Sequence, residues 1–275
     1  PDAYLEKLGE GDYAVRQGRR PSNMFLVEKL RQAVDHWRAT GYAGISSVTR
    51  RLFEYWFEED HLMPDGGFWR YWWAQREAVE TLVYLMEVSQ AKDFKALAEV
   101  FGDRPQFGLL SMDFMISTGM NGQRMLTRWV PEKEQDATVE LPVENLIRYA
   151  FKMATGSGKT EVKGMVVVWA YLNRKLGEKT SELWKTLADN FLIVAPNVIV
   201  FERLERDFAN NAIFNSRPLI PPEWKSSWGL KVILRGESAA PDPIGNLFLV
   251  NIQQIYESRQ EEWQPANPLD AILGV

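Results

Sequence analysis

The sequence predicts an α/β fold with a parallel sheet, preceded by a small helical N-terminal region. Three observations support this prediction. Amphipathic helical patterns dominate the first 66 residues. From about residue 147 onward, short apolar runs alternate with helix-length segments, a pattern typical of parallel α/β sheets. A glycine-rich segment at residues 153–160 separates one such apolar run from the helical pattern that follows it.

The N-terminal region begins with a polar, glycine-containing stretch over residues 1–20, which we expect to be a loosely packed lead-in. Apolar residues at three- and four-residue steps then predict a helix over residues 24–39. Ser46 or Ser47 can cap a second helix that ends near Phe57, because a serine hydroxyl accepts a hydrogen bond from a free N–H of the first turn.

A domain boundary is expected at the Pro-Asp-Gly-Gly turn of residues 64–67. This boundary separates a helical extension, residues 1–66, from a second domain, residues 67–275. Within the second domain, residues 91–146 combine glycines, prolines and a charged stretch, so we interpret them as an inserted mixed segment ending in a solvated loop. The remaining elements follow from periodicity: helices over 72–90, 159–176 and 198–208, and strands over 147–153, 191–195, 230–234 and 247–250.

Composition excludes several kinds of chemistry. The chain has 275 residues and no cysteine, which excludes disulfides, thiolate nucleophiles and cysteine-based metal sites. His36 falls in a predicted helix and His61 in an acidic turn, so we expect neither to be catalytic. The net charge is −5, so nucleic-acid contact needs a local patch or neutral donors. Without a signal-peptide pattern or a bilayer-length apolar run, we expect a cytoplasmic protein that makes no membrane contact.

The strongest motif is Met153-Ala-Thr-Gly-Ser-Gly-Lys-Thr160, between a predicted strand and a predicted helix. Glycines let backbone N–H groups turn toward phosphate oxygens, and the N-terminus of the helix adds a positive end. In this pattern Lys159 binds the β- and γ-phosphates and Thr160 offers its hydroxyl to Mg²⁺. Met153 stands where the general pattern has glycine, and a ligand-free turn is the alternative interpretation. The predicted nucleotide-binding residues are Thr155, Gly156, Ser157, Gly158, Lys159 and Thr160, of which Lys159 and Thr160 are also the candidate catalytic residues.

This segment resembles motif I of superfamily 2 helicases and translocases, in the form with Met first that the motor subunits of type I and type III restriction enzymes have. Residues 192–204 resemble motif Ia, and residues 248–254 resemble motif Ic with Asn251 in place of the more usual Thr. The chain is most similar to the motor (Res) subunits of type III restriction enzymes, over about residues 68–275. The resemblance implies a RecA-like P-loop lobe.

The resemblance also implies what the chain binds. It implies ATP and Mg²⁺ as cofactors, nucleic acid (DNA rather than RNA) as a partner, and a modification or other defence-system subunit as a second partner. The implied activity is that of an ATP-dependent nucleic-acid motor, a helicase or translocase of restriction-modification or phage-defence type. Motifs Ia and Ic follow the ends of predicted strands, the edge where open α/β sheets bind ligands. The candidate nucleic-acid contacts are Pro196, Asn197, Arg203 and Asn251.

Residues 70–78 resemble the segment that places a glutamine, here Gln75, against the adenine of ATP. A glutamine amide offers both an acceptor and donors, and the adenine edge offers N6–H₂ and N7 in return. The aromatic neighbours of Gln75 are expected either to stack on the base or to form an ordinary apolar cluster. These neighbours are Trp69, Tyr71, Trp72 and Trp73.

Parts of the family pattern are missing from the sequence. Superfamily 2 motors need an Asp-Glu pair, motif II, to position Mg²⁺ and the attacking water. Asp270 is the only late candidate, and no Glu follows it. Pro241-Asp242 resembles the start of a PD-(D/E)xK nuclease site, but no Glu-x-Lys follows, so we interpret it as a turn. We therefore expect the N-terminal part of a larger motor, one that binds ATP without turning it over.

Two other function classes stay open. A different P-loop enzyme, such as a small-molecule kinase, would need an arginine-rich lid and an acceptor site, and the sequence shows neither. A docking or nucleic-acid-binding module would use its helical N-terminus and some of its 11 tryptophans to bind a partner subunit, with the P-loop acting only as a switch.

Overall fold

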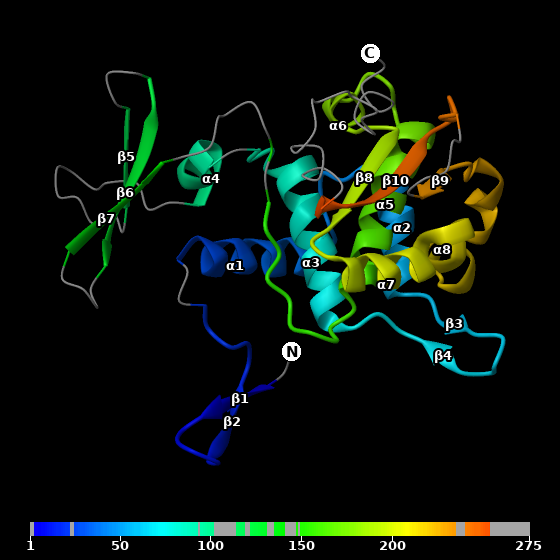
Figure 1. Ribbon diagram of the computed structural model, residues 1–275. Coiled ribbons are helices and arrows are strands. Elements are labelled where there is room, and N and C mark those ends of the chain that lie inside the picture. Colours follow the sequence, from blue (N-terminus) through cyan, green and yellow to red (C-terminus); the bar gives the residue numbers. More distant parts are fainter. Residues whose placement is uncertain are drawn as a thin grey trace. The chain divides into compact units, whose positions relative to one another are not determined.

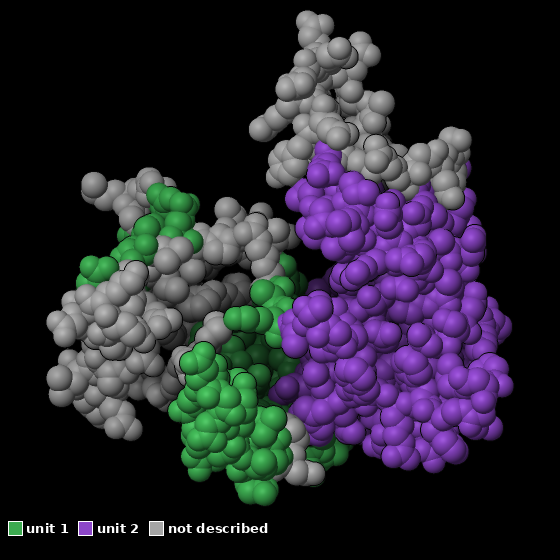
Figure 2. All heavy atoms as spheres, turned by 60° about the horizontal axis from the view of Figure 1, so that its bottom comes forward, with its two compact units in different colours: residues 1–43, 80–152 green, residues 44–79, 153–275 purple. Residues whose placement is uncertain are grey.

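The computed structural model divides the chain into two compact units, which Figure 2 shows in different colours. The first unit joins residues 1–43 to 80–152, and the second joins residues 44–79 to 153–275. The predicted boundary near residue 66 thus lies inside the second unit, and the division into two sequence-contiguous domains stays a prediction. The structure describes residues 3–22, 25–92, 94–101, 114–118, 122–130, 135–140, 147, 149–234 and 240–253.

The first unit begins with a hairpin rather than the predicted loose lead-in. Its strands pair antiparallel, with Leu5 opposite Val15, and Gly11 adopts the positive φ of +81° in the turn. The predicted helix over 24–39 is confirmed as α1. The elements of this unit are β1 (Ala3–Lys7), β2 (Tyr13–Gln17), α1 (Phe25–Ala39), η1 (a π-helical turn, Tyr84–Val88), α4 (Phe94–Phe101), β5 (Phe114–Thr118), β6 (Arg124–Val130) and β7 (Gln135–Glu140).

A buried ion pair holds α1 to the last turns of α3 (Trp73–Val83), the helix that passes from the second unit into the first. Glu80 is fully buried, and Arg38 donates to its Oε2 from Nε at 2.9 Å and from a second guanidinium nitrogen. Tyr42 donates its hydroxyl to the other carboxylate oxygen. Because every carboxylate oxygen of Glu80 has a donor, its burial is tolerated.

The predicted inserted segment contains α4 and a three-stranded antiparallel sheet in the order β5-β6-β7. Gln135 and Asp136, which we expected in a solvated loop, instead begin β7, where Asp136 pairs with Trp129. Strand β6 supplies the hydrogen-bonding partners for the backbone of these residues. The charged side chains in the sequence give no sign of that neighbouring strand. Residues 102–105 and 131–134 of the predicted segment lie outside the described residues.

The second unit carries a parallel sheet and its helices, as the sequence predicts. The central strand β10 pairs parallel with β8 on one side and β9 on the other, and α7 packs against β8 and β10 (Figure 1). The predicted helices over 159–176 and 198–208 are confirmed to the residue. The elements are α2 (Ser47–Phe57), β3 (His61–Leu62), β4 (Phe68–Trp69), the start of α3, α5 (Lys159–Leu176), α6 (Glu182–Thr186), β8 (Asn190–Ala195), α7 (Val198–Phe208), η3 (Ala209–Asn211), α8 (Ala212–Ser216), η4 (Pro222–Ser227), β9 (Lys231–Leu234) and β10 (Asn246–Asn251).

The strand predicted over residues 147–153 is wrong. The described residues of this segment, 147 and 149–153, adopt no regular structure and pair with no described strand. Ile147 and Phe151 are 36% and 40% exposed, although their apolar character suggested a buried strand. A strand exists only where a neighbour satisfies its backbone groups, and apolar character alone does not supply that neighbour.

Helix α2 packs against α5 through polar as well as apolar side chains. Ser46 caps α2 as predicted, since its Oγ accepts from the N–H of Thr49 at 3.0 Å. Thr49 and Asn173 are buried, and the Oγ1 of Thr49 accepts from Asn173 Nδ2 and from Trp169 Nε1, both at 3.0 Å. Helix α2 is therefore built into the same unit as the phosphate loop.

Candidate nucleotide-binding site

The phosphate loop, residues 153–160, leads directly into α5, whose first residue is Lys159. Gly156 and Gly158 adopt left-handed φ values of +78° and +76°, and Gly158 is the N-cap of the helix. Side-chain-bearing residues rarely adopt this conformation, so the glycines explain how the chain turns at this point. The turn brings the free N–H groups of the first helical turn to the loop, the arrangement that binds anions.

The polar side chains of the loop bond to the loop itself. Lys159 Nζ donates to the carbonyl oxygens of Ala154 at 2.7 Å and Met153 at 3.3 Å, and Ser157 Oγ donates to the same Ala154 oxygen at 2.7 Å. Lys159 is exposed and Thr160 is partly buried. Among the described residues the ammonium contacts neutral carbonyls and no carboxylate, so a phosphate oxygen would replace these partners without breaking an ion pair.

Gln75 meets this loop from α3. Gln75 is 5% exposed, and its Oε1 accepts from the backbone N–H of Trp72 at 2.7 Å, which is one half of a capping box at the start of α3. Its Nε2 lies 1.9 Å from the point that a Cβ on Gly158 would occupy. The structure thus brings together two of the predicted site residues that are far apart in the sequence, Gln75 and Gly158.

Two charged residues of the first turns of α5 lie beside the loop, and the sequence analysis did not single them out. Glu161 Oε2 lies 3.0 Å from the same Cβ position over Gly158. Desolvation lowers the pKa of Lys163, and the positive charge of Lys159 lowers it further. The signal that could have found them is their position, two and four residues after the motif I lysine on an amphipathic helix.

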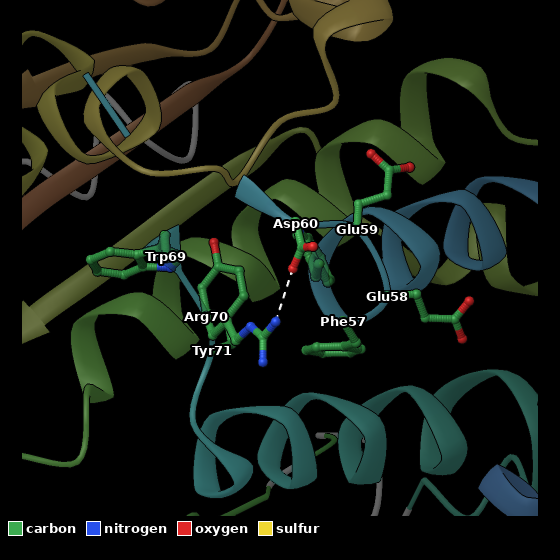
Figure 3. Close-up of a pocket in the computed structure, with 8 residues that line it drawn as sticks. Phe57, Glu58, Glu59, Asp60, Trp69, Arg70 and Tyr71 are labelled. Carbon is green, nitrogen blue, oxygen red and sulfur yellow. Dashed lines mark hydrogen bonds and ion pairs between the residues drawn. The ribbon is translucent and has the colours of Figure 1, made fainter. Parts of the chain in front are cut away.

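A pocket of about 270 Å³ lies between the end of α2 and the segment that precedes α3 (Figure 3). Its mouth carries an ion pair between Asp60 and Arg70 at 3.0 Å, and Figure 3 shows Glu58 and Glu59 pointing away from that pair. The pocket is lined by Trp56, Phe57, Glu58, Glu59, Asp60, Trp69, Arg70 and Tyr71. Aromatic rings from two segments therefore face a common space, which the sequence analysis anticipated only for Trp69 and Tyr71.

Tyr71 connects this pocket to the phosphate loop. Burial raises the pKa of Tyr71 well above its usual 10.0, and electrostatic interactions with Tyr55, in its ionised form, and with Glu161 raise it further. Its hydroxyl donates to the Pro218 carbonyl at 2.9 Å, which fixes the ring. Tyr71 directly precedes Trp72, whose N–H donates to the Gln75 Oε1, so the last residue of the pocket lining adjoins the segment that carries Gln75 to Gly158.

Three of the candidate nucleic-acid residues lie at the C-terminal ends of β8 and β10 or just after them, and Arg203 lies further along, in α7. Ala195 and Asn251 are partners in the parallel register, so the segments after these strands begin side by side. Pro196 and Arg203 are exposed. Asn197 is exposed too, but its Oδ1 accepts from the Val200 N–H at 2.9 Å and so caps α7.

Asn251 differs from the other three candidates, because it is only 2% exposed and its Oδ1 accepts from the Gln253 N–H at 3.0 Å. The amide therefore shapes the start of the segment that follows β10. Gln254 and Asp270, which belong to the predicted motif Ic and to the late motif II candidate, lie outside the described residues.

Other sequence candidates have structural roles. His61 is buried and bonds through Nε2 to the Tyr55 carbonyl at 2.7 Å. Asp242 accepts from the Ile244 N–H at 2.8 Å, which supports the turn interpretation of Pro241-Asp242. Across the described ranges, no three His, Asp or Glu side chains converge as a metal site. No helix in the described part of the chain combines the length and apolar character needed to cross a membrane.

A glycine-rich loop that opens a helix beside a parallel α/β sheet defines the class of P-loop nucleotide-binding proteins. Comparison with protein-family models matches residues 75–273 to the family described as type III restriction enzyme, res subunit. The chain therefore belongs to this family, and with it to the helicase-like, ATP-binding motors of restriction type. No curated protein and no solved structure matches the chain.

Proposed function

We propose that the chain binds MgATP at the phosphate loop and forms the ATP-binding part of a DNA-dependent motor, a translocase or helicase of a restriction or phage-defence system. One observation supports this most directly: the Gln75 amide lies over Gly158, at the entrance to α5. A base-reading residue and a phosphate-binding loop from distant parts of the sequence thus lie one side chain apart. A glycine-rich turn without a ligand would need no such neighbour.

The loop residues fit the roles of a nucleotide site. The left-handed glycines Gly156 and Gly158 turn the loop so that its backbone N–H groups can surround a phosphate, once the Ser157 N–H gives up its 3.4 Å bond to the Ala154 carbonyl. A Cβ on either glycine would be strained. Lys159 exchanges its carbonyl partners for the β- and γ-phosphates, and Thr160 offers its hydroxyl to Mg²⁺. When bound, Mg²⁺ neutralises phosphate charge and takes most of its other ligands from phosphates and water.

The aromatic pocket is the candidate site for the base. Tyr71 and Phe57 offer ring faces, and the cation of Arg76 lies 4.9 Å from the Phe57 ring centroid, in the first turns of the helix that carries Gln75. Stacking on aromatic rings stabilises a base without regard to its identity, so identity would be read at Gln75.

The nucleic-acid contacts belong to the segments after β8 and β10, in a unit that we propose to be a RecA-like lobe. Pro196 and Asn197 follow β8 and Asn251 ends β10, at the sheet edge where open α/β folds bind ligands. Arg203 lies in α7, the helix that follows β8. The sequence of this chain holds no Asp-Glu pair after its last strand, so we expect ATP binding without turnover by this chain alone.

The test is MgATP binding by the full chain and by Lys159→Ala. Losing a charge-assisted hydrogen bond to phosphate should weaken binding roughly tenfold to a hundredfold. Lys163→Ala is the matched control, since it removes a cation one turn further along the same helix and should change affinity far less. Equal affinity of the Lys159→Ala variant and the unaltered chain would remove the basis of this proposal.

A second candidate function, subunit docking, is favoured by one surface feature. The β3–β4 hairpin exposes an apolar cross-strand pair, Leu62 and Phe68, which are 69% and 71% accessible to solvent. We expect Leu62→Ser with Phe68→Ser to leave stability and MgATP binding unchanged while weakening association with a modification subunit. Unchanged association would argue against docking at this hairpin.

A further inference from the structure

Glu161 and Gln75 approach Gly158 from two different helices. The Oε2 atom of Glu161 lies 3.0 Å, and the Nε2 atom of Gln75 1.9 Å, from the same point, the Cβ position over Gly158. Within the described residues, the Glu161 carboxylate accepts no hydrogen bond and forms no ion pair, and the Gln75 amide group donates none. A carboxylate acceptor and an amide donor therefore lie over one α-carbon, each without a hydrogen-bonding partner there.

The hydrogen-bonding capacity of Gln75 shows what such a neighbour would do. A glutamine amide has two N–H donors and two acceptor lone pairs on its oxygen. The Trp72 N–H occupies one lone pair. If Glu161 accepts from one N–H of Gln75, the amide keeps one N–H donor and one acceptor lone pair for a ligand. The positions of that donor and that acceptor are then fixed.

That remaining pair suits one purine better than the other. Adenine presents a donor at N6 and an acceptor at N7, which match one acceptor and one donor of an amide. Guanine presents acceptors at both O6 and N7, so the amide oxygen would face another acceptor. An amide fixed on both sides therefore discriminates between the two bases, whereas an amide free to rotate would present two donors to guanine.

We propose that Glu161 is a positioning residue for nucleotide selectivity: it holds the Gln75 amide in the orientation that favours adenine over guanine. This inference rests on the proposed function, because it assigns a second role at the same site. Glu161 also lies in the first turn of α5, where any carboxylate stabilises a helix by its charge. The test must therefore separate hydrogen bonding from charge.

Glu161→Gln and Glu161→Ala make that separation, because both remove the charge and only the first keeps an acceptor oxygen. Affinities of the full chain for MgATP, MgGTP, the magnesium complex of 7-deaza-ATP, which lacks the N7 acceptor, and magnesium tripolyphosphate would be measured for each variant. Far-UV circular dichroism and thermal unfolding would establish that each variant is folded.

We expect Glu161→Ala to lower the preference for ATP over GTP about fivefold, the size of one ordinary hydrogen bond. Glu161→Gln should retain most of the preference. Both variants should bind tripolyphosphate alike. The effect of Glu161→Ala should be smaller for 7-deaza-ATP, which keeps only the N6 contact, and should vanish in a Gln75→Ala background.

Equal ATP preference in the alanine and glutamine variants would overturn the inference, as would an effect that persists without Gln75. Both results are compatible with ATP binding at the loop and would leave the proposed function intact. A chain that bound neither MgATP nor tripolyphosphate would instead overturn the proposed function, and this inference with it.

Discussion

The Gln75 amide occupies the space that a side chain on Gly158 would need: a Cβ there would come within 1.9 Å of Nε2. Position 158 therefore requires glycine for two reasons. Its φ of +76° disfavours any side chain, and the Gln75 side chain of α3 fills the space that a Cβ would need. Gly156 has a similar φ, +78°, but nothing lies within 4 Å of its Cβ position. The two glycines have similar φ values but different surroundings, because only Gly158 has the Gln75 side chain of α3 at its Cβ position.

This difference makes a direct prediction for alanine variants. Gly156→Ala should cost about 1–2 kcal/mol of unfolding free energy, the penalty for a left-handed alanine. Gly158→Ala should cost about 1–2 kcal/mol more, because the new methyl group displaces Gln75 and breaks its cap on Trp72. Urea unfolding would measure both. In a Gln75→Ala background, which already lacks the cap, Gly158→Ala should cost no more than Gly156→Ala. Equal costs for the two glycines would contradict the close contact.

Asn197 allows capping to be separated from nucleic-acid binding. Its Oδ1 caps α7, so Asn197→Ala should lower the unfolding free energy by about 1 kcal/mol, while Asn197→Ser should preserve it because a serine hydroxyl can cap as well. If the amide also contacts a phosphodiester backbone, both variants should weaken DNA binding to a similar extent. A titration of labelled duplex at fixed salt would decide, and loss of DNA binding in the alanine variant alone would indicate that only the cap matters.

The elements after residue 158 could be predicted well because their signals are local. The helix over 159–176 starts after a glycine and ends before Gly177, and α7 starts after the capping Asn197. Each of these boundaries depends on the side chains at the boundary itself. The same local logic narrowed the cap of α2 to Ser46 or Ser47, and the structure has Ser46.

The features that could not be predicted from the sequence are those that depend on contacts with distant parts of the chain. The apolar segment 147–153 has the character of a strand but no described strand to pair with, and the polar residues 3–17 pair with each other in a hairpin. For the site, Gln75 and the loop were each predicted from the sequence. Their contact, and the nearness of Glu161, depend on where α3 lies in the fold, which no local pattern encodes.

Thr49 tests whether α2 is a structural part of the unit that holds the phosphate loop. Thr49→Val keeps the shape but leaves the N–H groups of Asn173 and Trp169 without their acceptor, at about 1–3 kcal/mol for each buried donor. Thr49→Ser keeps the acceptor and loses only a methyl group, so it should cost about 1 kcal/mol. Chemical denaturation would rank the two variants, and a valine variant as stable as the serine variant would show that the network contributes little.

Tyr71 should make stability fall at high pH. Burial first, and then electrostatic interactions with ionised Tyr55 and with Glu161, raise the folded-state pKa of Tyr71 well above 10.0. From about pH 10 the unfolded chain therefore loses this proton while the folded chain keeps it, so stability falls by about 1.4 kcal/mol per pH unit until the folded pKa is passed.

Tyr71→Phe should make this decline shallower, although Tyr55, Tyr84 and Tyr171, whose pKa values burial also raises, continue to contribute. Below pH 10 the variant should lose about 1 kcal/mol, because the hydroxyl no longer donates to Pro218. Denaturant unfolding from pH 8 to pH 11.5 would give both quantities. An unchanged slope above pH 10 would be evidence against the raised pKa.

The first unit tolerates the buried carboxylate of Glu80 because Arg38 forms an ion pair with it. Arg38→Met removes the cation and leaves the carboxylate with Tyr42 as its donor, so the unfolding free energy should drop by about 3–5 kcal/mol, the cost of an uncompensated buried charge. Adding Glu80→Leu removes that charge and should restore most of the loss, because apolar residues of similar volume often replace a buried pair without penalty. Calorimetric unfolding of the two variants tests this order. If the double variant were less stable than Arg38→Met, Glu80 would favour folding even without its cation, and the expected cost of the uncompensated charge would be contradicted.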